Sequence, residues 1–470
     1  MKPTATEAGN AFAPFAQKMR ANGQSAASIK AFQHSYETFL SGDAGWMPEN
    51  TIAAIATLPN YVEIPTVSAA ERSLLAQTVV LKLNGGLGTG MGRSGPKSLL
   101  LVREGLTFLD LIAQQILHLR QGAATPRFLL MNSDATSKAT RAALQKYPAL
   151  GSPEQLELMQ SFVPKVDLAT GLPAEFAADP SLAWCPPGHG DIYPSLVGSG
   201  WLERFRASGC KYLFVSNSDN LGASLDLRLL RYFAASRLSF LMEVCERTAM
   251  DSKGGHLARR GQRFLLRESA QCPEADKQSF EDITRHRFFN TNNLWIQLDD
   301  LAVLLSQHGG FVPLPLIKNV KSVDPRDKQS PKVVQLETAM GAAIGEFERA
   351  GAIVVPRSRF APVKTCADLL AIRSDAFQVT PDHRIELHPQ RAGKPPTIRL
   401  DANHYARVDQ LDAALAGGIP SLLECDALSV EGAVTFSSQI SFRGTVAIRN
   451  AGTVAKPLSP GTYADQTITL

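Results

Sequence analysis

A glycine-rich stretch between residues 82 and 98 is the part of this chain best suited to binding a phosphate. It holds six glycines and ends on Pro96-Lys97-Ser98, directly after the apolar run Leu75–Leu83, which is typical of a buried parallel strand. Glycines let the backbone take positive φ and let main-chain N–H groups approach a ligand closely. Such a row of donors forms an anion-binding concavity, to which Lys97 adds a positive charge. The alternative is a flexible surface turn.

This stretch fits neither of the two common phosphate-binding motifs. A Walker A loop needs its lysine directly after the last glycine, but Pro96 stands between Gly95 and Lys97. The dinucleotide pattern of three glycines is present as Gly90, Gly92 and Gly95, but it starts too far from the strand. The sequence therefore predicts a phosphate loop of another kind.

An acidic residue follows a second apolar run. Asp219 lies in the polar segment Asn217–Gly222, after the run Tyr212–Val215. A carboxylate at the end of a buried strand, facing a phosphate loop, is well placed to hold Mg²⁺, which takes one or two carboxylates and completes its coordination with phosphates and water. The alternative is an Asn/Asp turn that merely terminates the strand.

Three more polar clusters suit chemistry. His189 stands between two glycines in a rigid turn, where it binds a phosphate or a sugar hydroxyl or simply supports the fold. The amide-rich string at residues 289–295 suits sugar hydroxyls or forms an Asx turn. Arg357, Arg359 and Lys364 follow a further apolar run, either as a phosphate-binding cluster or as a solvated basic loop.

Alternating strand and helix patterns predict the scaffold that positions these groups. Strands are expected at Arg127–Met131, Tyr212–Val215, Phe240–Val244 and Ile353–Val355. Thr107 and Asp110 fit a capping box for a helix that ends near Gly122. This order favours an α/β fold with an open sheet that binds ligands at the carboxyl ends of its strands, where the candidate residues fall.

The two ends of the chain have different patterns. Phe12, Phe15, Ala16 and Met19 recur at helical spacing, so residues 1–75 are expected to form a solvent-facing helical segment that packs on the core. From about Ala376 onward, short strands are expected at Thr397–Leu400, Ser429–Val434, Ser438–Arg443 and Thr445–Arg449. We therefore divide the chain into residues 1–75, a catalytic domain at 76–375, and a C-terminal domain at 376–470.

Composition excludes several classes of protein. A net charge of +4 over 470 residues is too small to indicate a nucleic-acid surface. The six cysteines include no C-x-x-C pair, which argues against zinc and a disulfide framework and favours a reducing compartment. We see no signal peptide and no run of about 20 apolar residues, so we expect a cytoplasmic protein with no membrane partner.

The glycine-rich string closely resembles the nucleotide-binding loop of the eukaryotic-type UTP–glucose-1-phosphate uridylyltransferases, or UDP-glucose pyrophosphorylases. Strings around Gly188, Asp219, Asn290 and Lys364 resemble the same family, so that the resemblance covers about residues 80–375. It implies a Rossmann-like, GT-A-like nucleotidyltransferase domain with a mixed sheet and helices on both faces. It also implies a C-terminal left-handed β-helix, which some members use for self-association. The β-helix portion of this chain is short, so the resemblance leaves open whether a homo-oligomer forms through this domain.

Matching the family's strings residue by residue implies roles for individual side chains. Lys364 and Lys97 are the expected catalytic residues, Asp219 is the expected Mg²⁺ ligand, and the string at Gln335–Ala339 is expected to open a helix. The residues expected to bind the nucleotide are Leu83, Asn84, Gly85, Gly86, Leu87, Gly88, Thr89, Lys97, Gln160, Gly188, Asp219 and Lys364. Those expected to bind the sugar phosphate are His189, Asn217, Ser218, Asp219, Gly254, Glu268, Asn290 and Asn292.

The resemblance implies a reaction in which UTP and glucose 1-phosphate give UDP-glucose and pyrophosphate, with Mg²⁺ as cofactor and in-line attack on the α-phosphorus. Positioning and charge stabilisation carry most of the rate of such a transfer. The nearest alternative is a UDP-sugar pyrophosphorylase of broader specificity; the G-T-R-L-G loop of the N-acetylhexosamine branch differs from Gly88–Gly92. The other alternative is a silent UDP-sugar sensor, although Lys97, Asp219 and Lys364 are all present.

Overall fold

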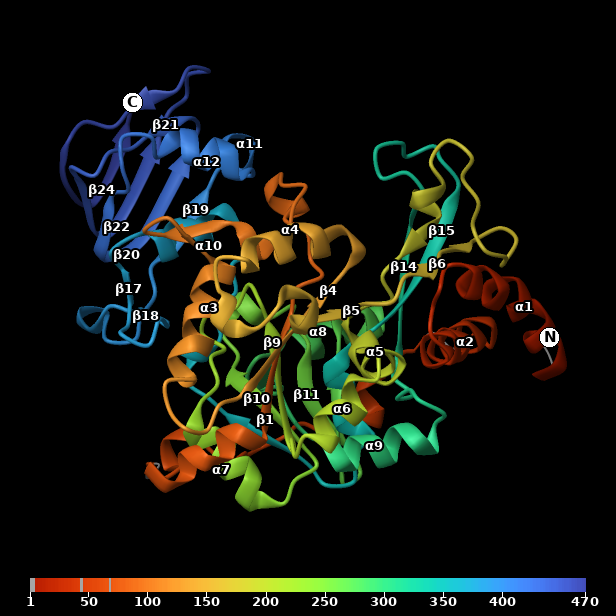
Figure 1. Cartoon of the computed structure of the whole chain (residues 1–470). Coiled ribbons are helices and arrows are strands. Elements are labelled where there is room, and N and C mark those ends of the chain that lie inside the picture. Colours follow the sequence, from red (N-terminus) through yellow and green to blue (C-terminus); the bar gives the residue numbers. More distant parts are fainter. Residues whose placement is uncertain (1–4, 43–44, 67–68) are drawn as a thin grey trace.

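The structure, a computed structural model, describes residues 5–42, 45–66 and 69–470 and centres on a nine-stranded mixed sheet (Figure 1). Seven strands run in the order β12-β11-β13-β9-β1-β4-β5, and β10 pairs with β13 and β16. β9, β1, β4 and β5 are parallel to one another, while β13 is antiparallel to β9 and β10. The strands are β1 (Thr78–Leu83), β4 (Arg127–Asn132), β5 (Glu157–Met159), β9 (Tyr212–Asn217), β10 (Phe240–Glu246), β11 (His256–Arg260), β12 (Arg263–Arg267), β13 (Phe288–Gln297) and β16 (Ala350–Val354).

The strand before the phosphate loop starts later than its apolar pattern predicts. Residues Ala69–Gln77 form a 3₁₀ helix, and β1 begins at Thr78. Within β1, Val79 and Leu81 face one apolar cluster and Val80 faces another. Both faces of the strand are therefore covered, as a parallel sheet requires.

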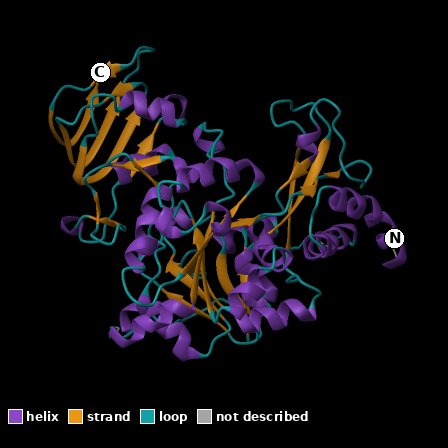
Figure 2. Ribbon diagram, in the orientation of Figure 1, coloured by secondary structure: helices purple, strands orange, loops and turns teal. Residues whose placement is uncertain are grey.

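Helices cover both faces of the central sheet, as expected (Figure 2). On the side of Val80 lie α3 (Phe108–Leu119), α4 (Asp134–Leu144), α7 (Leu227–Ser236) and α10 (Cys366–Arg373). On the side of Val79 lie α5 (Ile192–Gly198), α6 (Trp201–Ala207) and α9 (Leu298–Gln307). The predicted capping box of α3 is confirmed, because Asp110 N donates to Thr107 Oγ1 at 3.1 Å and Thr107 N donates to Asp110 Oδ2 at 2.9 Å. The helix ends at Leu119, not near Gly122.

The N-terminal helices α1 (Ala5–Ala21) and α2 (Ala26–Leu40) pack against a small separate sheet of β14 (Leu316–Ser322), β15 (Lys332–Thr338) and β7 (Val166–Asp167), as Figure 1 shows. Phe12, Phe15 and Met19 are buried there against β15 residues such as Val334, so this apolar face does not point to solvent. The rest of 1–75 is not α-helical where described, and residues 1–4, 43–44 and 67–68 lie outside the described part.

The prediction that a helix opens at Gln335–Ala339 is wrong. These residues fall in β15 and just after it, and the strand alternates buried and more exposed positions over residues 334–337. This period of two, after two consecutive β-branched valines, favours a strand over a helix. A 3₁₀ helix, Met340–Gly345, follows.

The C-terminal part forms a four-stranded parallel sheet in the order β19-β20-β22-β24. β19 (Thr397–Leu400) has the predicted bounds. The predicted strands at 438–443 and 445–449 are one strand, β22 (Ile440–Arg449), whose pairing shifts around Gly444 with φ 58°. The predicted strand at 429–434 is divided between β20 (Ser421–Glu431) and β21 (Val434–Thr435).

The apolar cluster on the Val80 face of the central sheet continues into these C-terminal strands. The last strand of the C-terminal sheet is β24 (Gly461–Thr469). The other α-helices and strands of the described residues are short: β2 (Leu101–Arg103), β3 (Leu106–Thr107), β6 (Val163–Pro164), β8 (Trp184–Cys185), α8 (Lys277–Glu281), β17 (Phe377–Val379), β18 (Ile385–Leu387), α11 (Ala402–Tyr405), α12 (Val408–Ala414) and β23 (Lys456–Pro457). Among the described residues, no helix has the length and apolar character that crossing a membrane requires.

Candidate active site

The charged pair Lys97–Asp219 lies where the phosphate loop meets the end of β9. Lys97 opens a 3₁₀ turn after the loop, and Asp219 comes two residues after β9. Lys97 Nζ donates to Asp219 Oδ2 at 2.6 Å, and each side chain is 18% exposed. Because β1 and β9 are parallel neighbours, their carboxyl ends bring both segments to one edge of the sheet.

The phosphate loop folds back on itself as a narrow hairpin. Gly88 N donates to Gly95 O at 3.2 Å and Lys97 N donates to Gly86 O at 3.1 Å, while Leu87 forms a bridge with Pro96. The outer positions of the loop, Gly86, Thr89 and Gly90, are exposed. The loop therefore holds Lys97 at the strand end and leaves outer backbone groups accessible to a ligand.

Conformational freedom of glycine is needed at one position of this loop. Gly92 has a φ of 73°, whereas the other five glycines, all of them described, have ordinary φ values. The expectation of positive φ therefore holds for Gly92 and is wrong for the rest. A Cβ on Gly85 would lie 2.7 Å from Gln160 Oε1, so a larger residue there would displace that amide.

Asn84 anchors the phosphate loop to the interior of the protein. Its side chain is 2% exposed, and Nδ2 donates to Asn132 Oδ1 at 2.7 Å and to Thr140 Oγ1 at 2.9 Å. These bonds tie the end of β1 to β4 and α4. The side chain of this predicted nucleotide-binding residue is therefore directed into the protein.

Leu83, Asn217 and Ser218 join the ends of the two central strands. Leu83 and Asn217 are opposite each other in the last pair of the β1–β9 register. Ser218 N then donates to Leu83 O at 3.0 Å, and the Ser218 side chain is 6% exposed. The predicted sugar-phosphate residues Asn217 and Ser218 thus begin the turn that presents Asp219.

Gln160 and Gly188 meet beside Gly85. Gln160 Nε2 donates to Gly188 O at 2.9 Å. Gly188 has a φ of 81°, and a Cβ there would lie 2.4 Å from Thr338 O, so no larger residue fits without a shift. The three predicted nucleotide-binding residues Gly85, Gln160 and Gly188 are therefore brought together.

His189 is held as a neutral imidazole. Its Nδ1 accepts a hydrogen bond from Met340 N at 3.0 Å, and burial lowers the pKa of His189 to about 4. With Nδ1 as the acceptor, the proton of the neutral ring lies on Nε2, which is left as a donor. This polarity suits a phosphate or hydroxyl oxygen.

The predicted sugar-binding residues surround the start of β11 and β13. A Cβ on Gly255 would lie 2.4 Å from Glu268 Oε2, and Asn290 N donates to Gly255 O at 3.3 Å. The side chains of Asn290 and Asn292 are joined by a 2.8 Å hydrogen bond, within a strand whose Asn292 has φ 59°. Gly254 packs against the Phe289 ring. The string is thus an irregular strand and not a free turn.

Lys364 comes to the same edge of the sheet as Lys97 and Asp219. Val363 N donates to Asp219 O at 3.2 Å, which places the following residue, Lys364, next to that loop. Lys364 is exposed. Burial raises the pKa of Glu268, and the positive charge of Lys364 opposes that rise.

The two arginines near Lys364 are paired within the protein. Arg357 forms two 2.8 Å hydrogen bonds with the carboxylate of Asp251. Arg359 is 7% exposed and binds both oxygens of Glu243, at 2.7 and 2.8 Å. Of the three cations that the sequence groups together, Lys364 is therefore the one that forms no ion pair with another described residue.

Two buried charged residues of the central sheet, Lys82 and Glu243, were not predicted from the sequence. Lys82 is 2% exposed, and its Nζ donates to Ser216 Oγ at 2.8 Å and to Ala223 O at 2.6 Å. Burial lowers the pKa of Lys82 to about 7. A lysine or glutamate inside an apolar strand was the available signal, because a buried charge requires partners.

Comparison with known proteins identifies the family. The family described as UTP–glucose-1-phosphate uridylyltransferase matches residues 29–443. The chain belongs to this family. The family predicted from the motifs is thereby confirmed, and with it a nucleotidyltransferase enzyme.

Related sequences and structures cover most of the chain. A probable UTP–glucose-1-phosphate uridylyltransferase of Schizosaccharomyces pombe is 38% identical over 433 residues, covering 89% of this chain and 84% of that protein. The corresponding enzyme of Saccharomyces cerevisiae is 43% identical over 379 residues, covering 80% and 74%. A mutant UDP-glucose pyrophosphorylase from Leishmania major in complex with UDP-glucose superposes with a TM-score of 0.93, 46% identity and 100% coverage of both chains.

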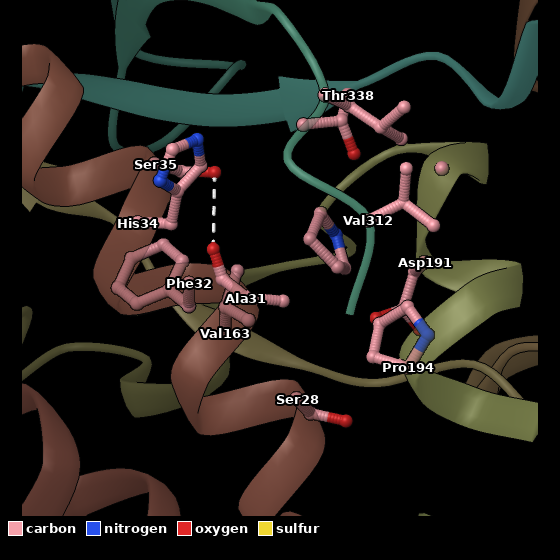
Figure 3. Close-up of a pocket in the computed structure, with 13 residues that line it drawn as sticks. Ser28, Ala31, Phe32, His34, Ser35, Val163, Asp191, Pro194, Val312 and Thr338 are labelled. Atoms are coloured by element: carbon pink, nitrogen blue, oxygen red, sulfur yellow. Dashed lines mark hydrogen bonds between the residues drawn. The ribbon is translucent and has the colours of Figure 1, made fainter. Parts of the chain in front are cut away.

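A small cavity of this uridylyltransferase lies between α2 and α5 (Figure 3). Ser28 and Phe32 of α2 line one side, and Asp191 and Pro194 line the other. Asp191 is 4% exposed, and burial raises its pKa to about 6. Lys97, Asp219 and Lys364 do not line this cavity.

The residues at the strand edge fit Mg²⁺, the cofactor that the sequence predicts. Asp219 offers one partly exposed carboxylate beside the phosphate loop. Within the described residues, no group of three or more His, Cys, Asp or Glu could hold a metal ion. A single carboxylate, completed by substrate phosphates and water, is a usual arrangement for Mg²⁺ in nucleotide sites.

Proposed function

We propose that this enzyme transfers the uridylyl group of UTP to glucose 1-phosphate, giving UDP-glucose and pyrophosphate. The observation that carries the proposal is the meeting of Lys97, Asp219 and Lys364 at one edge of the sheet, beside the phosphate loop. Two cations and a carboxylate at such a place suit a reaction between two phosphate groups.

The roles proposed for the loop residues follow from their placement. Exposed backbone around Gly86 and Thr89 would bind the triphosphate, and Lys97 would neutralise the departing pyrophosphate. Gln160, which already bonds Gly188 O, would offer its amide to the uracil edge. Asn290 and Asn292 would bind sugar hydroxyls, and the Nε2 proton of His189 would bind the sugar phosphate.

In the proposed reaction, a phosphate oxygen of glucose 1-phosphate forms a bond to the α-phosphorus of UTP. The bond from that phosphorus to the bridging oxygen breaks, and the electron pair leaves with pyrophosphate. Asp219 would hold Mg²⁺, which when bound neutralises phosphate charge. Lys364 would draw the two reacting phosphates together and offset the negative charge that crowds between them.

We propose further that the chain keeps the division 1–75, 76–375 and 376–470, and that the C-terminal parallel strands are coils of a left-handed β-helix. The parallel pairing of β19, β20, β22 and β24 supports the second point. Self-association through this part and a cytoplasmic location are proposed with it. Sedimentation at several protein concentrations would test the self-association.

The decisive experiment measures pyrophosphate release from UTP, Mg²⁺ and a panel of sugar 1-phosphates. Lys364→Ala should fold normally and lose on the order of 10²–10³ in kcat, because a preorganised charge is lost where the transition state needs it. Lys456→Ala, at an exposed position of the C-terminal part, is the matched control and should turn over like the wild type. Wild-type turnover in Lys364→Ala, or calorimetric binding of UDP-glucose without any turnover by the wild type, would refute the proposal.

A further inference from the structure

Asn220 joins the two loops that carry Asp219 and Lys364. It is 1% exposed and lies directly after Asp219. Its Nδ2 donates to Arg359 O at 3.1 Å, and its Oδ1 accepts from Ala361 N at 3.0 Å. An amide side chain offers a donor and an acceptor side by side, so it satisfies two opposite backbone groups of the neighbouring loop at once.

The residues on both sides of Asn220 also contact the loop that carries Lys364. On one side, Asp219 O accepts from Val363 N at 3.2 Å. On the other, a Cβ on Gly222 would lie 2.2 Å from Ser358 O, so the two backbones touch with no room for a side chain. The two loops are therefore in contact along their length, with the amide of Asn220 at the centre.

The backbone of Lys364 is fixed from its other side as well. Lys364 N donates to Asp368 Oδ2 at 2.9 Å, and the same carboxylate caps α10 through Thr365. The lysine thus sits between an anchor on the Asp219 loop and an anchor on a helix. Its side chain is free to meet a ligand, while its Cα is held.

The loop that carries Arg359 is itself fixed by a buried ion pair. Arg359, whose carbonyl accepts from Asn220, binds both carboxylate oxygens of Glu243. Glu243 is fully buried and also accepts from Trp295 Nε1 at 2.9 Å and Asn293 Nδ2 at 3.0 Å. A buried ion pair with these additional hydrogen bonds gives Asn220 a rigid partner.

We propose that Asn220 is a positioning residue whose amide sets the separation between Asp219 and Lys364. This inference rests on the proposed roles of those two residues in the reaction. A misplacement of reacting groups by about 1 Å can cost on the order of 10²-fold in rate. Asn220 does not reach the substrates itself, because both ends of its buried amide are bonded within the protein, to the backbone of Arg359 and Ala361 and to the Asn293 side chain.

Two variants of Asn220 and one matched pair elsewhere test this role. Asn220→Asp keeps the acceptor for Ala361 N and loses the donor, while Asn220→Ala loses both. Asn450 is a comparably buried amide in the C-terminal part: it is 5% exposed, its Nδ2 donates to Ala433 O at 2.6 Å and to Val454 O at 2.8 Å, and its Oδ1 accepts from Gly452 N at 3.0 Å. Asn450→Asp and Asn450→Ala therefore make the same chemical change away from the site.

Both Asn220 variants should lower kcat on the order of 10²-fold and leave KM for UTP and for the sugar phosphate within about threefold. The Asn450 variants should lower the thermal midpoint comparably and leave kcat unchanged. Wild-type kcat in both Asn220 variants, or a loss confined to KM, would overturn the inference. So would an equal loss of kcat in the Asn450 variants.

A double variant shows whether Asn220 acts through Lys364. The fold-loss caused by Asn220→Asp should shrink when Lys364 is already alanine, because the group to be positioned is gone. The same fold-loss in both backgrounds would overturn the inference. Wild-type turnover in Lys364→Ala alone would instead overturn the proposed function, so the two failures are distinguishable.

Discussion

This enzyme has Arg–Glu pairs in two opposite surroundings, buried beneath the site and exposed on the C-terminal sheet. Beneath the site, Glu243 and Arg359 are 0% and 8% exposed and lie 2.7 Å apart. On the C-terminal sheet, Glu431 and Arg449 are paired across β20 and β22 at 3.1 Å, with both side chains more than 60% exposed. Water screens the second pair and not the first, so the cost of breaking each should differ greatly.

Breaking the buried pair should have the largest effect on stability. Glu243→Gln leaves the guanidinium of Arg359 inside the protein without its bidentate partner. Because that charge remains desolvated, we expect a loss of about 3–5 kcal/mol in the free energy of unfolding, measured by urea denaturation.

The matched control for this variant is Glu424→Gln, which removes the same charge from an exposed pair with Arg443. We expect a change below about 1 kcal/mol there. Equal losses in the two variants would mean that burial does not set the strength of these pairs.

A buried acid without a cation sharpens the comparison. Asp191 is 4% exposed, and its Oδ2 accepts from Ser161 N at 2.6 Å and Ser195 Oγ at 2.7 Å, while no cation of the described chain pairs with it. Burial raises its pKa to about 6, above the ordinary carboxyl value of about 4. The native state therefore binds this proton more tightly than the unfolded state does.

The stability that Asp191 contributes is thus fully present below about pH 4 and is lost as the pH rises through about 6. Asp191→Asn keeps an acceptor for both hydrogen bonds and cannot ionise. Relative to the wild type, it should gain up to about 3 kcal/mol at about pH 8 and nothing at about pH 4, in urea denaturation at each pH. A difference between the two proteins that is independent of pH would contradict the assigned pKa.

The sequence predicted the strands and loops of the site because their signals are local. The apolar runs, the glycines before Lys97 and the capping box at Thr107 each lie within a few residues. Parallel strands then bring their carboxyl ends together without further information, which explains why Lys97 and Asp219 meet.

Local sequence signals could not predict the direction in which individual side chains point. Arg359 and Lys364 stand in one basic segment, yet one is buried and the other exposed, because the partner that draws Arg359 inward comes from β10, more than a hundred residues earlier. Gln335–Ala339 was misassigned for a related reason: one of the two strands that pair with its strand, β7, is remote in sequence. Pairing over such separations requires the fold.

The smallest effect should come from the exposed pair with which the comparison began. Arg449→Ala removes one cation from the outer face of the C-terminal sheet, where Glu431 is already solvated. We expect a change of about 0–1 kcal/mol in the free energy of unfolding, and a smaller one in about 1 M salt, where the Debye length is only about 3 Å. Urea denaturation at low and high salt measures both. A loss above about 2 kcal/mol, insensitive to salt, would show that Arg449 stabilises the sheet through its packing and not through its charge.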